Sequence, residues 1–280
     1  MEHFEGMEEK YIETNGIKLH TMIIGSGEPL LLVHGFPDFW YGWKNIIPGL
    51  KDKYRLIIPD MRGFNLSDKP EGANNYEMKY ILDDIKGLSE ALNLGKFNIA
   101  GHDYGGAAVW AFAAKYPELL NKLIVINAPH VQIMTRLLRT DDEQKNASKY
   151  MLTLRKPNSE KILMENNFQA IRELFFGEVK RKDGYNEFDE KKYIEAWSQP
   201  GALTGGLNWY RAPVTNFYSE IKVPTLVIHS MNDRFFTNKI LDGLSDYVKD
   251  LKIVRIENAN HWIKIDDPEV VVSSIKEFIG

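Results

Sequence analysis

The chain contains, near its start, two segments in which apolar and polar residues alternate. Residues 11–14 and 18–24 show this period of two, and Asn15-Gly16 lies between them. Alternation with a period of two is typical of strands that are half-buried, and Asn-Gly between two such segments favours a tight turn. We therefore predict an antiparallel hairpin over this part of the chain.

Short, continuous apolar runs follow and alternate with longer segments of helical character. The runs cover residues 29–33, 54–58, 97–100, 123–126, 224–229 and 252–256. Runs of this kind predict strands that are buried on both faces of a parallel sheet. The predicted helices cover residues 41–50, 79–92, 107–114 and the stretch after 268. Strands that alternate with helices indicate an α/β fold with a mostly parallel central sheet and helices on both of its faces.

The alternation stops between about residues 129 and 221. This segment contains helical stretches at 143–154, 161–175 and 190–197 and no convincing strand pattern. Because it is inserted between two strands, we predict a helical cap over the carboxyl edge of the sheet, where open α/β sheets bind their ligands. The predicted domains are a core, residues 1–128 and 222–280, and a cap, residues 129–221.

Composition narrows the class of protein. The 280 residues are 44% hydrophobic and 26% charged, as in ordinary globular proteins. A net charge of −4 and a pI near 6.0 argue against a nucleic-acid partner. The absence of cysteine excludes disulfides and thiol chemistry. We find no apolar signal segment and no apolar stretch near the roughly 20 residues of a spanning helix, so we expect a cytoplasmic protein without a membrane partner.

The stretch Gly101-His102-Asp103-Tyr104-Gly105-Gly106 lies between a predicted strand and a predicted helix. Its glycines flank Asp103 in the pattern of a nucleophile elbow, G-x-nucleophile-x-G. Such a turn admits only very small neighbours and holds the central residue outward in a strained conformation. Serine is the commoner residue at this position, so the aspartate directs the choice of chemistry.

A nucleophile on such an elbow needs a histidine and an acid that orients the histidine, in the chain order nucleophile, acid, histidine. Asp233 and His261 fit this order, and each lies just beyond a predicted strand at the same edge of the sheet. A single aspartate in a turn is usually only a turn former. The order and the placement together predict Asp103 as nucleophile, His261 as general base and Asp233 as the residue that orients His261.

Over essentially its whole length the sequence resembles the α/β-hydrolase superfamily. More narrowly, it resembles the branch of epoxide hydrolases and dehalogenases, in which the nucleophile is an aspartate. His34-Gly35-Phe36-Pro37 is similar to the oxyanion-hole motif of that branch. The resemblance implies an oxyanion hole formed by the backbone N–H groups of Phe36 and Tyr104, and a cis bond between Phe36 and Pro37.

An aspartate nucleophile suits attack on an sp³ carbon. With an ordinary pKa near 3.9, its carboxyl is already ionised at neutral pH and displaces a leaving group to form an alkyl ester. Water activated by His261 then attacks the carbonyl carbon of Asp103, and the oxyanion hole stabilises the developing charge. Ester or peptide hydrolysis through an acyl-serine is therefore disfavoured.

The leaving group decides between the two activities of the branch. An epoxide leaves as an alkoxide and needs a proton donor, and tyrosine, with an ordinary pKa near 10, is a suitable acid. Residues 205–211 resemble the cap segment that carries one such tyrosine in epoxide hydrolases, which indicates Tyr210. Residues 149–152 resemble, over a shorter match, the segment that carries the other, which indicates Tyr150.

Two alternatives stay open. A haloalkane or haloacid dehalogenase has the same triad, but this chain has Phe36 and Tyr104 where haloalkane enzymes have halide-binding asparagine and tryptophan. Many epoxide hydrolases also have tryptophan at the second position, so Tyr104 is a departure from either pattern. A non-catalytic receptor for a small ligand is the alternative of another class, and it has no need of His261 or Asp233. Epoxide hydrolysis is the favoured hypothesis.

The remaining expectations concern the pocket and the partners. Aromatic residues are expected to line an apolar substrate pocket, namely Phe39, Trp40, His130, Trp209 and Trp262. For His130 a purely structural role is equally open. We expect a small apolar epoxide as substrate, no metal, no cofactor, and a monomer or a homodimer.

Overall fold

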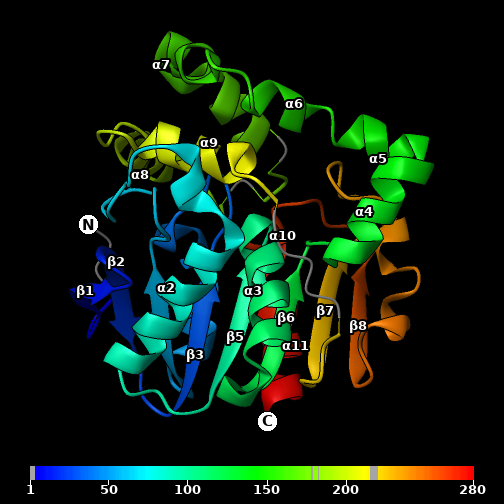
Figure 1. Ribbon diagram of the computed structural model, residues 1–280. Helices are drawn as coiled ribbons and strands as arrows, with labels where there is room; N and C mark the ends of the chain where they lie inside the picture. Colours follow the sequence, from blue (N-terminus) through cyan, green and yellow to red (C-terminus); the bar gives the residue numbers. More distant parts are fainter. Residues whose placement is uncertain (1–3, 178, 182, 215–219) are drawn as a thin grey trace.

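The computed structural model of the protein describes residues 4–177, 179–181, 183–214 and 220–280. Eight strands form one central sheet, in the order β1-β2-β4-β3-β5-β6-β7-β8 (Figure 1). β1 and β2 are antiparallel, β2 is antiparallel to β4, and the other pairs are parallel. The strands are β1 Glu8–Thr14, β2 Ile17–Ile24, β3 Glu28–Val33, β4 Tyr54–Pro59, β5 Phe97–His102, β6 Leu120–Ile126, β7 Thr225–Ser230 and β8 Leu251–Ile256.

The predicted hairpin is confirmed. Thr14 pairs with Ile17, so Asn15 and Gly16 form a two-residue turn. Both residues have positive φ, 46° and 76°, the conformation that a tight hairpin turn of this kind requires. Asparagine and glycine tolerate this conformation better than other residues, which explains why the pair fixes the turn.

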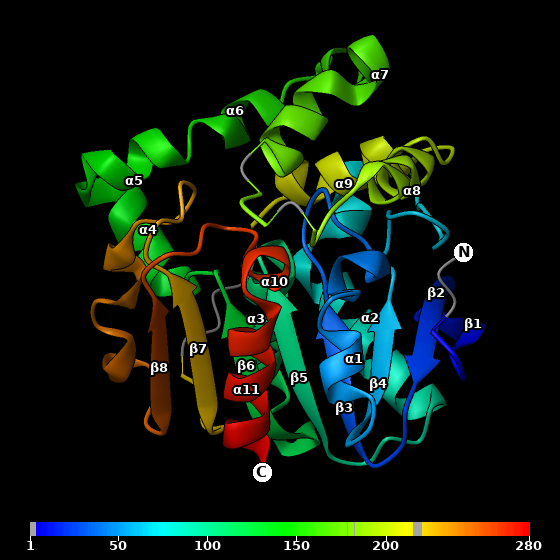
Figure 2. The ribbon, with the colours of Figure 1, turned by 180° about the vertical axis from the view of Figure 1, so that it is seen from behind.

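Helices cover both faces of the sheet. α2 (Met78–Ala91) and α3 (Tyr104–Lys115) lie on the face turned to the viewer in Figure 1, and α1 (Ile47–Leu50) and α11 (Pro268–Ile279) lie on the other, seen in Figure 2. Along β3, Leu31 and Val33 belong to one apolar core cluster, whereas Leu30 and Leu32 belong to the other. All four side chains are fully buried. The continuous apolar run therefore serves two cores, as predicted.

The predicted helix over residues 41–50 is wrong as a single element. The chain forms a 3₁₀ turn at Trp40–Trp43 and, after a break, the short helix α1. Pro48 lies at the start of α1, where its missing N–H costs nothing because the first turn has no partner for it. In a helix that began at residue 41 the same proline would lie in the interior and disrupt it.

Between β6 and β7 the described residues form helices and no named strand. These cap helices are α4 Val131–Thr140, α5 Asp142–Ala147, α6 Tyr150–Leu154, α7 Ser159–Phe176, α8 Glu187–Trp197 and α9 Ala202–Arg211. They lie above the carboxyl ends of the parallel strands (Figures 1 and 2). The division of the chain into a core domain and a cap domain stays a prediction.

The three predicted cap stretches correspond in part to four of the six described helices, and the other two were missed. The expected helix over 143–154 is divided into α5, which ends at Ala147, and α6, which begins at Tyr150. The backbone of α7 leaves the helical conformation at residues 165–168. α4 and α9 were not predicted as helices. None of the helices in the described part of the chain is long and apolar enough to cross a membrane.

A buried ion pair joins the loop after β3 to the short helix α10 (Ile263–Asp266) at the carboxyl edge of the sheet. The Lys264 ammonium donates to Asp38 Oδ2 at 2.7 Å, and both side chains are about 2% exposed. The hydroxyl of Tyr193, on cap helix α8, donates to Asp38 Oδ1 at 2.9 Å. Asp38, in the loop after β3, therefore binds both the segment after β8 and cap helix α8.

We expect Lys264→Met to destabilise the protein strongly. The substitution keeps a long apolar side chain but leaves the buried Asp38 carboxylate without its cation, which typically costs about 3–5 kcal/mol. For a chain of this size the midpoint of thermal unfolding should fall by on the order of 10 °C. Thermal unfolding followed by circular dichroism measures this change.

The matched control is Lys252→Met. Lys252 pairs with Glu277 on the surface, where the two side chains are 42% and 73% exposed. An exposed pair contributes about 0–1 kcal/mol, so this variant should unfold close to the wild type. Equal midpoints for both variants would contradict the structural role assigned to Lys264.

Candidate active site

Asp103 lies at the turn between β5 and α3. Its backbone has φ 55° and ψ −127°, a conformation that residues with a side chain rarely adopt. A Cβ atom on Gly101 would lie 2.5 Å from the carbonyl oxygen of Gly105, and one on Gly105 would lie 2.3 Å from that of His34. Only glycine fits at both positions. The glycines thus permit the sharp turn that presents Asp103 at the sheet's edge.

The loop after β3 returns over the same point. Its Phe36–Pro37 bond is cis, as the resemblance implied. The backbone N–H of Phe36 donates to Asp103 Oδ1 at 3.0 Å. A Cβ on Gly35 would lie 2.2 Å from Asp103 Oδ1 and 2.7 Å from the backbone nitrogen of Tyr104, so the three groups crowd together here. Tyr104 opens α3, whose positive N-terminal end favours a negative oxygen.

His261 lies between two carboxylates. Its Nδ1 is 2.7 Å from Asp233 Oδ2, and its Nε2 is 3.4 Å from Asp103 Oδ2. Asp233 is held in turn, because its Oδ1 accepts the backbone N–H groups of Phe235 at 2.8 Å and Phe236 at 3.1 Å. The three residues predicted as a triad therefore form one chain of contacts at the carboxyl edge of the sheet.

The charges of the site act on His261 in opposite directions. Burial disfavours the imidazolium, but the carboxylates of Asp233 and Asp103 outweigh burial and raise the pKa of His261 to about 10. The resting imidazole is thus protonated at neutral pH. Removal of one of the two negative charges lowers this pKa and turns His261 toward the neutral form, which accepts a proton.

Tyr150 and Tyr210 approach Asp103 from the cap helices. Tyr150 opens α6 and is half-buried, whereas Tyr210, near the end of α9, is 4% exposed. Burial raises the pKa of both phenols well above the ordinary value, and the negative charge of Asp103 raises it further. Both hydroxyls therefore stay protonated at neutral pH, and each can donate a proton to a stronger base.

Two hydrogen bonds hold the end of α9 that carries Tyr210. The Tyr104 hydroxyl donates to the carbonyl oxygen of Trp209 at 2.6 Å, and Nε of Arg155 donates to that of Tyr210 at 2.8 Å. The ring of Tyr210 also packs edge-on against Tyr104 and Phe36, with centroids 5.2 and 5.5 Å apart. The position of Tyr210 is thus fixed from both the core and the cap.

Two cavities meet at Asp103. The larger has a volume of about 240 Å³ and is mostly apolar, and the smaller has a volume of about 10 Å³ and includes His261 in its lining. Asp103, Tyr150 and Tyr210 line both. The carboxylate and the two hydroxyls therefore stand at the junction between a large space and a small one.

The five aromatic residues predicted for the substrate pocket are not all found at these two cavities, and their role in binding stays a prediction. Trp262 lines the smaller cavity, but Phe39, Trp40, His130 and Trp209 are absent from the lining of both cavities as far as the described residues define them. These four side chains make packing contacts elsewhere. The ring of His130 stacks on Tyr247, with centroids 4.6 Å apart. Phe39, Trp40 and Trp209 pack into the core, and Trp209 also donates to the backbone.

Sequence reasoning missed most of the large cavity's wall. One side is formed by α4 through Val131, Met134 and Leu138, and Arg155 lies at another side. The three α4 residues are spaced i, i+3 and i+7, the period of one helix face, so the signal was present in the sequence. Within the described residues, no group of three or more histidine, aspartate or glutamate side chains is arranged to hold a metal ion.

The chain is similar to known proteins over most of its length. The family model described as alpha/beta hydrolase fold matches residues 28–268. An AB hydrolase superfamily protein of Bacillus subtilis, YfhM, is 38% identical over 98% of this chain and 99% of its own length. Epoxide hydrolase 4 of Homo sapiens is 33% identical over 96% of this chain and 77% of its own.

A solved structure is also similar over its full length. The crystal structure of a Bacillus megaterium epoxide hydrolase in complex with an inhibitor superposes with a TM-score of 0.92 at 30% identity. It covers 96% of this chain and 99% of its own. The eight-stranded sheet and the helices above it are therefore an arrangement shared with that enzyme.

We expect Asp103→Asn to lower the pKa of His261. Asparagine keeps the shape of the side chain but removes one of the two charges that hold the imidazolium, so the titration midpoint should move from near 10 to lower pH by at least about 1 pH unit. Nitrogen-15 NMR of the imidazole measures the midpoint. Asp142→Asn, which removes an exposed carboxylate on α5, is the control and should leave it unchanged.

The same pKa predicts the pH dependence of stability. The folded-state pKa of about 10 exceeds the unfolded value near 6.5, so the folded protein binds the additional proton between these values. This contribution to the free energy of unfolding is complete below about pH 6.5 and is lost as the pH rises toward 10. If the titration midpoint of His261 were unchanged in Asp103→Asn, the charge of Asp103 would explain neither the raised pKa of His261 nor the pH dependence of stability.

Proposed function

The chain belongs to the α/β-hydrolase family, in its epoxide hydrolase branch, and we propose that it converts an epoxide and water to a vicinal diol through an ester on Asp103. One observation carries the proposal. An ionisable carboxyl and two protonated phenols, Tyr150 and Tyr210, line the same junction of cavities. Ring opening requires a nucleophile that attacks a ring carbon and an acid that donates a proton to the epoxide oxygen.

In the first step Asp103 attacks a ring carbon. Oδ1 accepts the Phe36 N–H, so Oδ2 is the oxygen that forms the new C–O bond. The bond between this carbon and the epoxide oxygen breaks, and its electron pair goes to the oxygen. Tyr210 and Tyr150 donate to this oxygen, because an alkoxide is a stronger base than a phenolate even where burial raises the phenol pKa.

The second step hydrolyses the ester. A cavity of about 10 Å³ is close to the smallest space that holds one water molecule, and His261 and Asp103 both line it. His261 takes a proton from this water, whose oxygen attacks Cγ of Asp103. The Phe36 N–H, with that of Tyr104, then stabilises the negative charge on Oδ1. When the carbonyl forms again, the bond between Cγ and Oδ2 breaks, and Oδ2 takes the proton held by His261 and leaves as a hydroxyl group of the diol.

The charge of the site coordinates the two steps. With both aspartates ionised, the pKa of His261 is about 10, so the histidine is protonated and is no base. Ester formation removes the negative charge of Asp103, which lowers the pKa of His261. The general base therefore becomes available only after the nucleophile has reacted.

The dehalogenase alternative is weakened by the same residues. Stabilisation of a halide requires side-chain donors beside the nucleophile. Phe36 has none, and the hydroxyl of Tyr104 is engaged with the carbonyl oxygen of Trp209 at 2.6 Å. Since neither side chain offers a free donor at the positions that haloalkane enzymes use, ring opening is the reaction that these contacts support.

We expect Tyr210→Phe to slow ring opening by about 10²-fold or more, the usual contribution of a general acid, with Tyr150 left to act alone. Ester hydrolysis does not need this hydroxyl and should continue at close to the wild-type rate. Rapid-mixing experiments with an epoxide in single turnover separate the two steps, for example through the intrinsic fluorescence of the protein.

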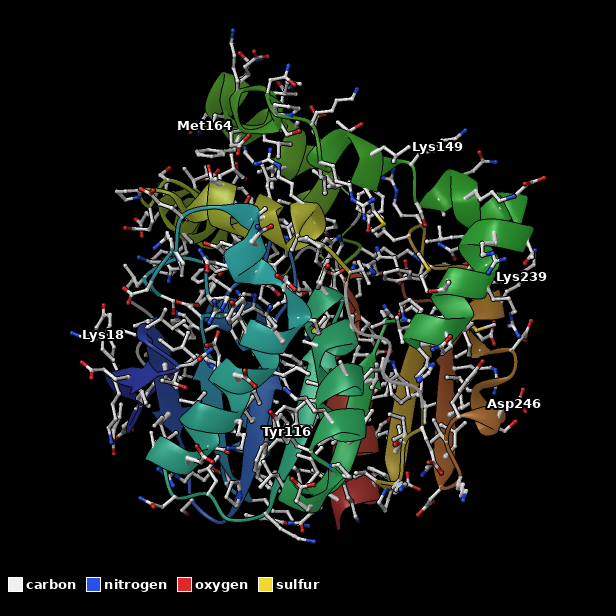
Figure 3. The ribbon with its side chains drawn as sticks, in the orientation of Figure 1. Lys18, Tyr116, Lys149, Met164, Lys239 and Asp246 are labelled. Carbon is white, nitrogen blue, oxygen red and sulfur yellow. The ribbon has the colours of Figure 1, made fainter. Side chains whose placement is uncertain are left out.

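Tyr116→Phe is the matched control for this prediction. Tyr116, labelled at the lower end of α3 in Figure 3, away from the cap helices, donates to Asp83. Loss of its hydroxyl should leave both steps unchanged. Full ring-opening activity in Tyr210→Phe would remove Tyr210 as a proton donor, and no epoxide turnover by the wild type would refute the proposed function.

A further inference from the structure

The two cavities at Asp103 are very unequal. Their volumes are about 240 Å³ and about 10 Å³, and an epoxide ring held between Asp103 and the hydroxyls of Tyr150 and Tyr210 lies at their junction. The two ring carbons carry their substituents away from each other. If one carbon faces the large cavity, the other faces the small one.

The large cavity accepts an apolar group of considerable size. Its lining is mostly apolar and includes Ile81, Trp110, Met134 and Met151. An apolar protein cavity of about 150 Å³ is sufficient to bind benzene. A space of about 240 Å³ therefore accommodates an aryl group with a short linker.

The small cavity has a wall of packed side chains. Leu154 from α6 and Leu174 from α7 line it, together with Phe235 and Trp262. The rings of Phe235 and Trp262 each pack against His261 with centroids 4.8 Å apart. The two rings are thus held in place by contacts with the imidazole of His261, and the two leucines form the aliphatic part of the wall.

The small cavity also has a second use. Under the proposed function it holds the water that His261 activates, and its volume of about 10 Å³ matches one water and no more. A bulky group on the second ring carbon would collide with the wall and would also occupy the position of this water. Such a substrate is disfavoured in both steps.

We infer that this protein acts on terminal epoxides that carry one apolar substituent, and that Leu174 and Leu154 exclude epoxides with a bulky group on each ring carbon. The inference rests on the proposed function and goes beyond it, because ring opening by Asp103 does not by itself select either class. The discriminating feature is the difference between the two cavities.

The first test compares two substrates of the wild-type enzyme. Styrene oxide has one free ring carbon, and trans-β-methylstyrene oxide has a methyl group on that carbon. Because one misplaced methyl or methylene in an apolar pocket is discriminated by about 10–200-fold, kcat/KM for the second should be lower by this factor. trans-Stilbene oxide, with an aryl group on each carbon, should give no measurable turnover.

The second test uses two variants with the same chemical change on opposite sides of Asp103. Leu174→Ala enlarges the small cavity, and we expect it to raise kcat/KM for trans-β-methylstyrene oxide relative to styrene oxide by about 10-fold or more. Leu138→Ala enlarges the rim of the large cavity instead. This control should leave the ratio of the two substrates as in the wild type.

The outcomes are distinguishable. Similar kcat/KM values for styrene oxide and trans-stilbene oxide would overturn the inference and leave the proposed function intact. A gain in Leu138→Ala without one in Leu174→Ala would likewise overturn it. If the wild type turns over none of the three epoxides, the proposed function and the inference fail together. The wild-type comparison needs no variant, so a folding defect in Leu174→Ala does not remove the test.

Discussion

A single close approach, between the loop after β3 and the turn after β5, determines the rest of the site. Asp103 Oδ1 accepts the Phe36 N–H at 3.0 Å, in a space so narrow that a Cβ on Gly35 would lie 2.2 Å from that oxygen. This contact distinguishes the two carboxylate oxygens, because Oδ1 accepts a hydrogen bond from the backbone and Oδ2 faces His261. The glycines at 35, 101 and 105 are the condition for it, since each lies where a side chain would collide.

The charges of the site determine the order of the two proposed steps. The imidazole of His261 lies 2.7 Å from Asp233 and 3.4 Å from Asp103, and the two carboxylates hold its pKa near 10. Under the proposed mechanism the nucleophile loses its charge when it forms the ester, so the base is released by the step that precedes its use. Before ring opening the phenols of Tyr150 and Tyr210 are protonated, since burial and the charge of Asp103 both raise their pKa.

The α/β fold class and the membership of the hydrolase family, which the sequence predicted, are confirmed, and the reason is that their signals are local. Apolar runs, an Asn-Gly turn and a glycine-flanked elbow constrain the backbone wherever they occur. The arrangement of Asp103, Asp233 and His261 could also be predicted from the sequence, because residues that follow parallel strands meet at one edge of the sheet. The contacts of the aromatic residues expected in the pocket could not be predicted in this way. His130 turns toward Tyr247, more than a hundred residues away in sequence, and the face that α4 presents to the cavity depends on how the cap helices pack.

The central claim is that the oxygen delivered to the substrate comes from Asp103 and that water replaces it only afterwards. A single turnover in water enriched in oxygen-18, with the enzyme in excess over the epoxide, tests this directly. We expect the first diol to carry no label and mass spectrometry of the peptide containing Asp103 to show one labelled oxygen. Label in the diol of the first turnover, with an unlabelled Asp103, would contradict the ester mechanism.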